Sequence, residues 1–411
     1  MSITSKRIMR LFGKVVNRLI PKHKDWIYVE PHINGKTDKF DLINCNADNS
    51  LKTINYFINN YQGRICRLYI EVYDKDRMPE LERYVKTVGN RDIEVVFLES
   101  CWDQKGKKIT FDVLVRFIRN HLIRYSCHVW CADTGWAHFF DKVKPQKLIS
   151  FNYGVPFKRG GVYSKYFTFE HFDYICETSM MCSKIIAAEY LGNYDSFVDI
   201  GFARNDTIGY SDKRDVVNAW LKSIGCEDKK IIVYVPTYRP NPIDYSENNI
   251  FGFKDNGELD EILERNNAII IAKVHPVQRK WMTNLPSNVI SFEPSYDFTI
   301  YDVFNMTNVL ISDYSSISTD FILAHKPIIY LFSDFDEYAD SRGYSFEPIQ
   351  DVCCGDVVYS WDEMKESLEK NLNNEIVRDE LYEMKKRLWF KYDDFKSTER
   401  NYNLLKQVME L

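Results

Sequence analysis

The sequence predicts an α/β protein with two doubly wound lobes, each built on a parallel sheet covered by helices. Short apolar runs alternate with stretches of helical periodicity along most of the 411 residues, a pattern typical of βαβ units. The alternation forms two series, because the turn-rich segment 201–214 interrupts it and a second series begins near Lys229. We expect the two sheets to face each other across a cleft, with ligands at the carboxyl ends of their strands.

Residues 1–24 differ from the rest of the chain and are expected to form a basic amphipathic helix. The segment carries seven lysine and arginine residues and no acidic residue. Apolar side chains recur at helical spacing until a proline ends the pattern, namely Ile8, Leu11, Phe12, Val15, Val16 and Leu19. Such a helix suits an anionic membrane interface, whereas a helix packed on the protein's own body with a solvated basic rim fits equally well. A cleaved transit peptide is disfavoured, because serines are few and no cleavage signal follows.

The first lobe is predicted to span residues 25–210. Its strands are expected at Trp26–Glu30, Ile65–Tyr73, Ile93–Leu98, Cys127–Cys131, Lys147–Phe151, Tyr174–Cys176 and Phe197–Ile200. Helical periodicity predicts intervening helices at Leu51–Asn60, Met78–Val88, Phe111–Arg124 and Met180–Tyr190.

The second lobe is predicted to span residues 211–385, with a helical tail at 386–411. Its strands are expected at Ile231–Val235, Ala268–Val274, Val289–Phe292, Val309–Ile311 and Ile328–Phe332. Helices are expected at Leu259–Asn266, Tyr301–Met306 and Ile317–His325.

Composition excludes several classes of protein. An apolar share of 45% is enough to bury a core and excludes intrinsic disorder as the main state. The net charge of −5 excludes a chain-wide basic surface for nucleic acid. No apolar run approaches the roughly 18 residues that span a bilayer, so a soluble or peripheral protein is expected. The ten cysteines contain no Cys-x-x-Cys pair, which gives a zinc site little support and indicates reduced thiols in the cytosol.

The most informative polar segment follows the predicted strand 309–311. There the chain reads Ser-Asp-Tyr-Ser-Ser (312–316) and then enters a helix. Ser315 and Ser316 would lie at the start of that helix, where free backbone N–H groups and the helix dipole favour a phosphate. A plain serine cap of the helix is the alternative explanation for the same residues.

Three further polar turns follow strands of the second lobe. His275 comes after the second strand, where it could donate to a phosphate oxygen or act as an acid for a leaving group. Thr237 and Arg239 lie in the turn after the first strand, and the arginine offers a bidentate contact for phosphate. Arg342 follows the last strand. Because parallel strands end at one common edge, these turns together predict a nucleotide-phosphate cleft.

The sequence lacks the fingerprints of several other enzyme classes. Neither the Gly-x-Gly-x-x-Gly of dehydrogenases nor the Gly-x-x-x-x-Gly-Lys-Ser/Thr of P-loop proteins is present. No Gly-x-Ser-x-Gly elbow supports a hydrolase. No metal site is predicted.

A connected set of motifs runs through the second lobe. Its members are Tyr-Val-Pro-Thr-Tyr-Arg (234–239), Lys-Val-His-Pro (273–276), Leu-Ile-Ser-Asp-Tyr-Ser-Ser (310–316), Asp320-Phe321, Lys326-Pro327-Ile328, and Tyr338 with Arg342-Gly343. With this set the chain resembles the CDP-glycerol glycerophosphotransferases, a family of teichoic acid and capsule polymer synthesis with the two-lobed GT-B architecture. The likeness covers roughly residues 145–405, and further family-like positions are Gly201-Phe-Ala-Arg-Asn-Asp206, Asp393, Ser397, Glu399 and Arg400.

The resemblance implies transfer of a polyol phosphate, most simply glycerol phosphate, from a CDP-alditol to a hydroxyl of a lipid-linked glycan or growing polymer. CMP would be released, and since the CDP-alditol is a substrate, no cofactor is expected. The resemblance also implies that the lobe 25–210 is the acceptor side and that the lobe 211–385 binds the donor nucleotide. The residues that the resemblance assigns to the donor diphosphate are Arg239, His275, Ser315, Ser316 and Arg342. Thr237 and Asp320 lie in the same matched motifs and are further donor-binding candidates. His275 and Asp313 are also catalytic candidates, and electrostatic clamping of the phosphoryl group is expected to supply most of the catalysis.

One departure from the family pattern concerns the general base. The family carries Trp-His-Gly-Thr-Pro-x-Lys, with the histidine taken as the base, whereas this chain reads Asn-Tyr-Gly-Val-Pro-Phe-Lys (152–158). Tyr153 therefore stands at the histidine position as the third catalytic candidate, although a phenol with a pKa of about 10 is a poor base near neutral pH. His171, His138 or Asp133 could replace it, the clamp alone could suffice, the acceptor chemistry could differ, or the chain could be an inactive relative. Two smaller departures are Cys-Cys-Gly-Asp (353–356), where Pro-Gly-Pro is common, and Phe395, where the tail motif has glycine.

These observations favour a transferase at the cytoplasmic face of a bacterial plasma membrane. Its partners would be a nucleotide-diphosphate donor, a lipid-linked glycan acceptor and, through residues 1–24, an anionic membrane surface, but no nucleic acid. A sugar-nucleotide glycosyltransferase of capsule or lipopolysaccharide synthesis is the alternative enzyme. A nucleotide-binding scaffold that has lost catalysis is the alternative outside enzymes.

Overall fold

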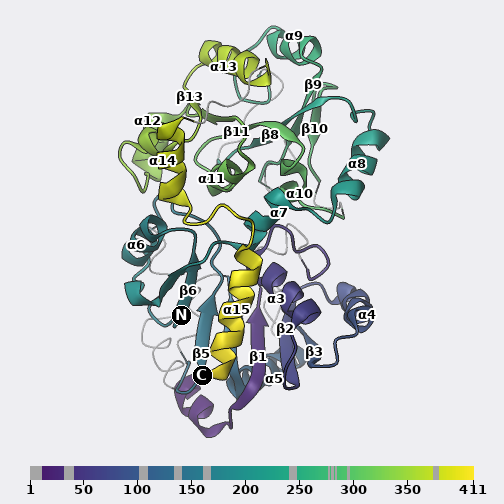
Figure 1. The fold of residues 1–411 in the computed structure, drawn as a ribbon, viewed down its shortest axis with the longest axis vertical. Coiled ribbons are helices and arrows are strands. Elements are labelled where there is room, and N and C mark those ends of the chain that lie inside the picture. The colour runs from purple at the N-terminus through teal and green to yellow at the C-terminus, as the bar shows by residue number, and fades with distance from the viewer. Residues whose placement is uncertain are drawn as a thin grey trace. The chain divides into compact units, whose positions relative to one another are not determined.

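The computed structural model describes residues 12–31, 41–100, 110–133, 141–160, 168–239, 248–275, 278, 282, 285–293, 297–373 and 379–411. The chain forms two compact units (Figure 1). The first, called the first lobe below, comprises Met1–Tyr153, Tyr163–Arg204 and Lys396–Leu411. The second lobe comprises Gly154–Val162 and Asn205–Phe395.

The first lobe contains a seven-stranded parallel sheet with the strand order β3-β2-β1-β4-β5-β6-β7. The strands are β1 (His23–Glu30), β2 (Cys66–Val72), β3 (Ile93–Glu99), β4 (Cys127–Ala132), β5 (Lys147–Ser150), β6 (Tyr174–Glu177) and β7 (Phe197–Asp199). The helices are residues 12–19, α3 (Asn49–Asn60), α4 (Met78–Val88), α5 (Phe111–Ser126), α6 (Met180–Glu189) and α15 (Ser397–Glu410).

Alternation along the strands gives the first sheet two apolar faces. In β1, Ile27 and Val29 enter one buried cluster, together with residues of α3 and α15. Tyr28 points to the other face and packs with Trp130 of β4. Figure 1 shows α15 running beside α3 in front of the sheet, so the end of the chain completes the core of the first lobe.

The second lobe contains a six-stranded parallel sheet with the order β10-β9-β8-β11-β12-β13. Its strands are β8 (Lys230–Val235), β9 (Ala268–Ala272), β10 (Val289–Ser291), β11 (Thr307–Ser312), β12 (Ile328–Leu331) and β13 (Asp356–Val358). The helices are α7 (Asp206–Gly209), α8 (Arg214–Ser223), α9 (Glu258–Arg265), α10 (Ile300–Phe304), α11 (Ser316–Phe321), α12 (Phe335–Ser341), α13 (Trp361–Asn373) and α14 (Glu380–Trp389).

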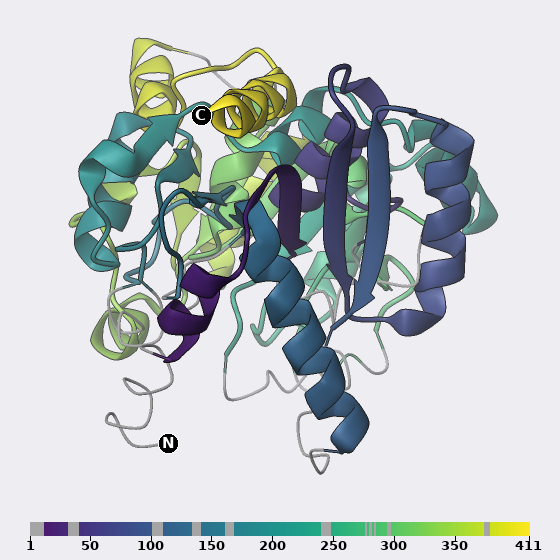
Figure 2. The same cartoon turned by 90° about the horizontal axis from the view of Figure 1, so that it is seen from below.

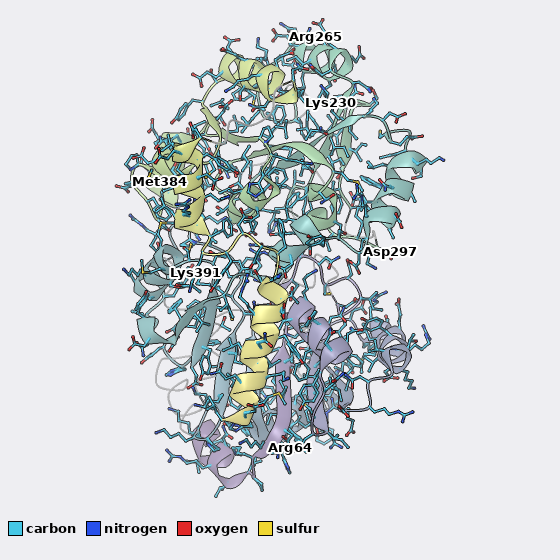
Figure 3. All side chains as sticks on the ribbon, viewed as in Figure 1. Arg64, Lys230, Arg265, Asp297, Met384 and Lys391 are labelled. Atoms are coloured by element: carbon cyan, nitrogen blue, oxygen red, sulfur yellow. The ribbon has the colours of Figure 1, made fainter. Side chains whose placement is uncertain are left out.

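The strand order of the second sheet locates its ligand edge. From β8 the chain moves to β9 and β10 on one side, and then crosses back to β11 on the other side of β8. Ligands of doubly wound sheets bind at such a switch point, outside the carboxyl ends of the strands. Lys230, labelled in Figure 3, marks the opposite, amino-terminal edge as the first residue of β8.

Two parallel-sheet α/β lobes are thus confirmed, and the expected cleft between them stays a prediction. The strand candidates fall on β1–β12 with shifts of a few residues at their ends, while β13, α7, α8, α12 and α13 had no counterpart among the candidates. The lobe boundaries also differ from the predicted ones. Residues 154–162 belong to the second lobe, and α15 belongs to the first.

The amino-terminal segment is helical only in part of its described portion. Residues 12–19 form a helix, β1 already begins at His23, and residues 1–11 lie outside the described residues. Val16 and Ile20 pack against the first lobe, whereas Phe12 and Leu19 are 70% and 79% exposed. Among the described residues, no helix combines the length and apolarity that crossing a membrane requires.

Candidate active site

The carboxyl ends of β8 and β11 are joined through Asp313. The Thr237 backbone N–H donates to Oδ1 of Asp313 at 2.8 Å, and Nη2 of Arg239 donates to Oδ2 at 2.9 Å. The Asp313 carboxylate is 6% exposed, so it is committed to bracing two adjacent strand ends. The predicted catalytic residue therefore holds the switch point of the sheet together.

Arg239 is surrounded by carboxylates and aromatic rings. Its Nε donates to Oδ2 of Asp334 at 2.6 Å, and Nη1 donates to the Thr237 carbonyl at 3.0 Å. The guanidinium lies 5.3 Å from the ring centre of Tyr314 and 4.9 Å from that of Tyr338. Burial disfavours its charge, but Asp313 and Asp334 outweigh this effect and raise the pKa of Arg239 above its usual value. The guanidinium N–H groups that were predicted to bind phosphate thus donate to two protein carboxylates, Asp313 and Asp334. In this structure Arg239 stabilises the loops around the site.

Ser315 and Ser316 present their side chains differently from an ordinary helix cap. Ser315 has extended backbone before α11, yet its hydroxyl makes no capping hydrogen bond. The Ser315 carbonyl instead accepts from the N–H and the hydroxyl of Ser318, at 3.1 and 2.7 Å. Both predicted serines are half-buried, and their hydroxyls have no hydrogen-bond partner among the described residues. The alternative of a plain serine cap is therefore not what the structure contains.

His275 and Arg342 complete the predicted set at this edge. His275 lies three residues after β9, is exposed, and its ring centre is 4.9 Å from that of Tyr238. Arg342 follows directly after α12, and its backbone N–H donates to the Tyr338 carbonyl at 2.9 Å. Both residues thus come from connections that follow carboxyl ends of the sheet, as expected.

Lys158 joins this edge from a part of the chain assigned by sequence to the other lobe. The segment 154–162 docks on the second lobe, where Lys158 forms an antiparallel bridge with Tyr344 and the Arg159 N–H donates to the Gly343 carbonyl at 3.1 Å. Burial lowers the pKa of Lys158 to about 8, with Arg342 and Arg239 adding to the decrease and Asp313 opposing it. Lys158 retains the lysine that ends the family motif Trp-His-Gly-Thr-Pro-x-Lys, but the sequence did not show that it lies with Arg342 and Asp313, because the docking of the segment brings these residues together.

The structure corrects the prediction for Asp320. This residue is 0% exposed inside α11, and the Tyr301 hydroxyl donates to its Oδ2 at 2.5 Å. A side chain with no exposed surface cannot touch a donor, so Asp320 supports the position of α11 against α10. Its place in a matched motif reflects packing.

Tyr153 lies in a separate polar loop of the first lobe, after β5. It is 50% exposed, and its backbone N–H donates to Oδ1 of Asn152 at 2.7 Å. Asn152 has a φ of 55°, a left-handed conformation that asparagine tolerates better than most residues. The Arg204 guanidinium donates to the Tyr153 carbonyl and lies 6.0 Å from the phenol ring centre. The loop is therefore fixed at both its backbone and its ring.

The groups considered as replacements for the family histidine differ in accessibility. Asp133 is 2% exposed, and burial together with the neighbouring Asp48 raises its pKa well above the usual value. Because it is buried, Asp133 lacks a surface for an acceptor. The side chain of His171 is 32% exposed and lies 4.0 Å from Glu170. His138 lies outside the described residues.

The tail positions that resemble the family motif hold the chain together locally. In the first lobe, Nε of Arg400 donates to the Ile200 carbonyl at 2.8 Å, and the Cβ of any residue other than glycine at 201 would lie 2.3 Å from Oγ of Ser397. In the second lobe, Phe395 has a φ of 51°, which explains why glycine suits this position. Its ring lies against Gly209, whose added Cβ would be 2.5 Å away. These contacts hold the tail in place within each lobe.

The fold and its polar edge define a two-lobed α/β protein of the kind that binds nucleotides at the ends of parallel strands. The chain belongs to the CDP-Glycerol:Poly(glycerophosphate) glycerophosphotransferase family, whose model matches residues 88–407. The resemblance inferred from the motifs of the second lobe is thereby confirmed.

The chain is also similar to curated relatives in sequence and to a solved structure in fold. The chain is 29% identical over 178 residues to the teichoic acid ribitol-phosphate polymerase TarL of Staphylococcus aureus, covering 42% of this chain and 30% of the relative. It is 27% identical over 227 residues to the teichoic acid poly(glycerol phosphate) polymerase of Bacillus spizizenii, covering 53% of each. The chain thus spans about half or less of the length of these relatives. A structure of a variant of the wall teichoic acid polymerase TagF, soaked with CDPG, matches with a TM-score of 0.69 and 15% identity, over 98% of this chain and 93% of that chain.

Proposed function

We propose that this protein transfers a polyol phosphate, most simply glycerol phosphate, from a CDP-alditol to a hydroxyl of a lipid-linked glycan or a growing teichoic-acid-like or capsular polymer. The acceptor oxygen attacks the β-phosphorus of the donor as the bond to the bridging oxygen breaks, and CMP leaves. The proton of the acceptor hydroxyl passes to a base or to water. No cofactor takes part in these steps.

The observation that carries this proposal is the set of polar groups at the carboxyl edge of the second sheet. The hydroxyls of Ser315 and Ser316, after β11, have no hydrogen-bond partner among the described residues. The exposed His275 follows β9, on the other side of β8. Hydroxyls and an imidazole can donate to phosphoryl oxygens, and donors placed at a charged transition state lower its energy. The curated relatives named for glycerol-phosphate and ribitol-phosphate polymers support a CDP-alditol as the donor.

The direct test is CMP release from CDP-glycerol in the presence of an undecaprenyl-linked acceptor. We expect turnover with CDP-glycerol or CDP-ribitol, and a loss of roughly 100-fold or more in His275→Ala and in the double variant Ser315→Ala/Ser316→Ala. Circular dichroism should match the native protein, because none of the three side chains contributes to a buried core. Binding of UDP- or GDP-sugars in place of both CDP-alditols would contradict the proposal and favour a glycosyltransferase.

We also propose that the protein acts as a peripheral enzyme on the inner face of the bacterial plasma membrane, held there by its amino-terminal segment. Basic residues surround the exposed Phe12, Val15 and Leu19 of the helix 12–19. Figure 2 shows this helix beside α5, and Gly13 lies against Tyr125 at the carboxyl end of α5. Helix α5 exposes an apolar stripe of its own, made of Phe111, Leu114, Val115, Ile118 and Leu122. Apolar side chains with basic neighbours suit an interface of anionic lipids.

Sedimentation with vesicles tests the membrane proposal. We expect Phe12→Asp/Leu19→Asp to weaken binding to vesicles that contain anionic lipid, because two exposed apolar contacts are replaced by charges of the same sign as the lipid. Native binding should weaken further as salt rises. Tyr210→Asp, at a residue 77% exposed in the second lobe, is the matched control. Equal binding of the double variant and the native protein would mean that the helix serves only the packing of its own lobe.

A further inference from the structure

We propose that Lys158 binds the diphosphate of the donor and supplies the positive charge that the sequence motifs had assigned to Arg239. The inference rests on the proposed function and adds a residue to the same site. Lys158 belongs to the segment 154–162, which docks on the second lobe and pairs with Tyr344, next to Arg342.

The first argument is that the Lys158 ammonium has no partner of its own. Its side chain is half-buried, yet among the described residues no carboxylate lies within 4.0 Å and no acceptor is hydrogen-bonded to it. Withdrawing a charge from water without a partner is unfavourable, and the lowered pKa of Lys158 reflects this cost. An anionic ligand would provide the missing partner.

The second argument is an unsatisfied hydroxyl beside the same carboxylate. Thr237 is 8% exposed, and its Oγ1 has no hydrogen-bond partner among the described residues, although its backbone N–H is bonded to Asp313. Buried hydroxyls usually have a partner, so an isolated one requires an explanation. The negative charge of Asp313 also raises the pKa of Lys158, against the effect of burial. Ser315 lies two residues after Asp313 in the sequence. In the described part of the chain, the Thr237 hydroxyl after β8 and the Ser315 hydroxyl after β11 thus lack partners at the two strand ends that Asp313 joins, and the same carboxylate influences the charge of Lys158.

The third argument compares the roles of the two cationic side chains, Arg239 and Lys158. The N–H groups of Arg239 donate to Asp313, Asp334 and the Thr237 carbonyl. The positive charge of Arg239 is therefore already balanced by two carboxylates. Lys158 has no such balance. A ligand with several acceptor oxygens and a double negative charge matches the unpartnered donors, and a pyrophosphoryl group has that chemistry. We therefore infer that Arg239 holds the loops of Asp313 and Asp334 in place, whereas Lys158 contacts the anion.

Binding measurements on the full chain test this inference. By calorimetry, Lys158→Met is expected to weaken CDP-glycerol binding about 10- to 100-fold, the usual loss for a charge-assisted contact, while Lys158→Arg retains part of the affinity. Lys222→Met, at an exposed position of α8 in the same lobe, should bind as the native protein does. Equal affinity of native protein and Lys158→Met for CDP-glycerol would overturn the assignment and leave the proposed function intact.

Thermal unfolding without ligand separates binding from a structural role. Removing an unpartnered ammonium should leave the melting temperature of Lys158→Met equal to or above that of the native protein. A lower melting temperature together with unchanged affinity would show that Lys158 serves the docking of its segment, and would overturn the proposal. Pyrophosphate provides the remaining probe. If the native protein binds pyrophosphate but not CDP-glycerol, and Lys158→Met binds neither, the anion site stands while the proposed donor fails. If native protein and Lys158→Met bind pyrophosphate equally, Lys158 does not contact the anion.

Discussion

At the residue scale, Tyr153 is the position where this chain departs most from its family. The phenol is half exposed, and Asn152 and Arg204 fix its loop, so the side chain has a defined place without being part of a core. An ordinary phenol titrates near pH 10 and an imidazole near 6.5, so a histidine would remove a proton more readily at neutral pH. If the side chain at position 153 contacts the acceptor hydroxyl, replacing Tyr153 by histidine is thus expected to provide a stronger base at neutral pH.

Substitution of Tyr153 by histidine and by phenylalanine tests this role. We expect Tyr153→His to keep or exceed native CMP release, with a pH profile that inflects near 6.5, and Tyr153→Phe to lower the rate. The same readings on Tyr210→His, at an exposed tyrosine of the other lobe, provide the control. Activity of the phenylalanine variant together with total loss in the histidine variant would mean that the loop needs the shape of an aromatic ring and uses no base here.

At the element scale, the sequence predicts what depends on local pattern. Strand β11, the serine turn and α11 follow one another as expected, because an apolar run, a polar turn and a helix start are all visible within about twenty residues. The short strand β13, with only three residues, offers no comparable pattern. Periodicity thus locates the long elements and the carboxyl edge of the second sheet.

Pairing between distant elements could not be predicted in this way. The interaction of Arg239 with Asp334 joins residues 95 positions apart, and it changes a predicted phosphate ligand into a support. Lys158 reaches the second lobe only through an excursion of nine residues from the first. Residue type and spacing identify which side chains can bind phosphate, whereas the partners that occupy them are set by tertiary structure.

At the scale of the whole molecule, the chain crosses between its lobes several times. Residues 154–162 leave the first lobe early, and α15 returns to it after the second lobe is complete. Gly201 shows how closely that return is packed, since its φ of 86° and its contact with Ser397 exclude a side chain. Boundaries placed at residues 210 and 385 from composition and motif spacing miss these crossings, because an amphipathic helix does not reveal which sheet it covers.

The last helix is therefore expected to stabilise the first lobe, although it follows the second in sequence. Leu405 of α15 is fully buried in the cluster that contains Ile27 and Val29 of β1. Leu405→Ala should lower the free energy of unfolding of that lobe by about 2–5 kcal/mol, the usual cost of such a cavity. Hydrogen exchange should then show faster exchange in β1 and β4 than in β8 and β11. Gln407→Ala, at an exposed position of the same helix, should leave all four strands unchanged. Equal loss of protection in both sheets would contradict this assignment, because it would mean that α15 stabilises the two lobes as a single cooperative unit.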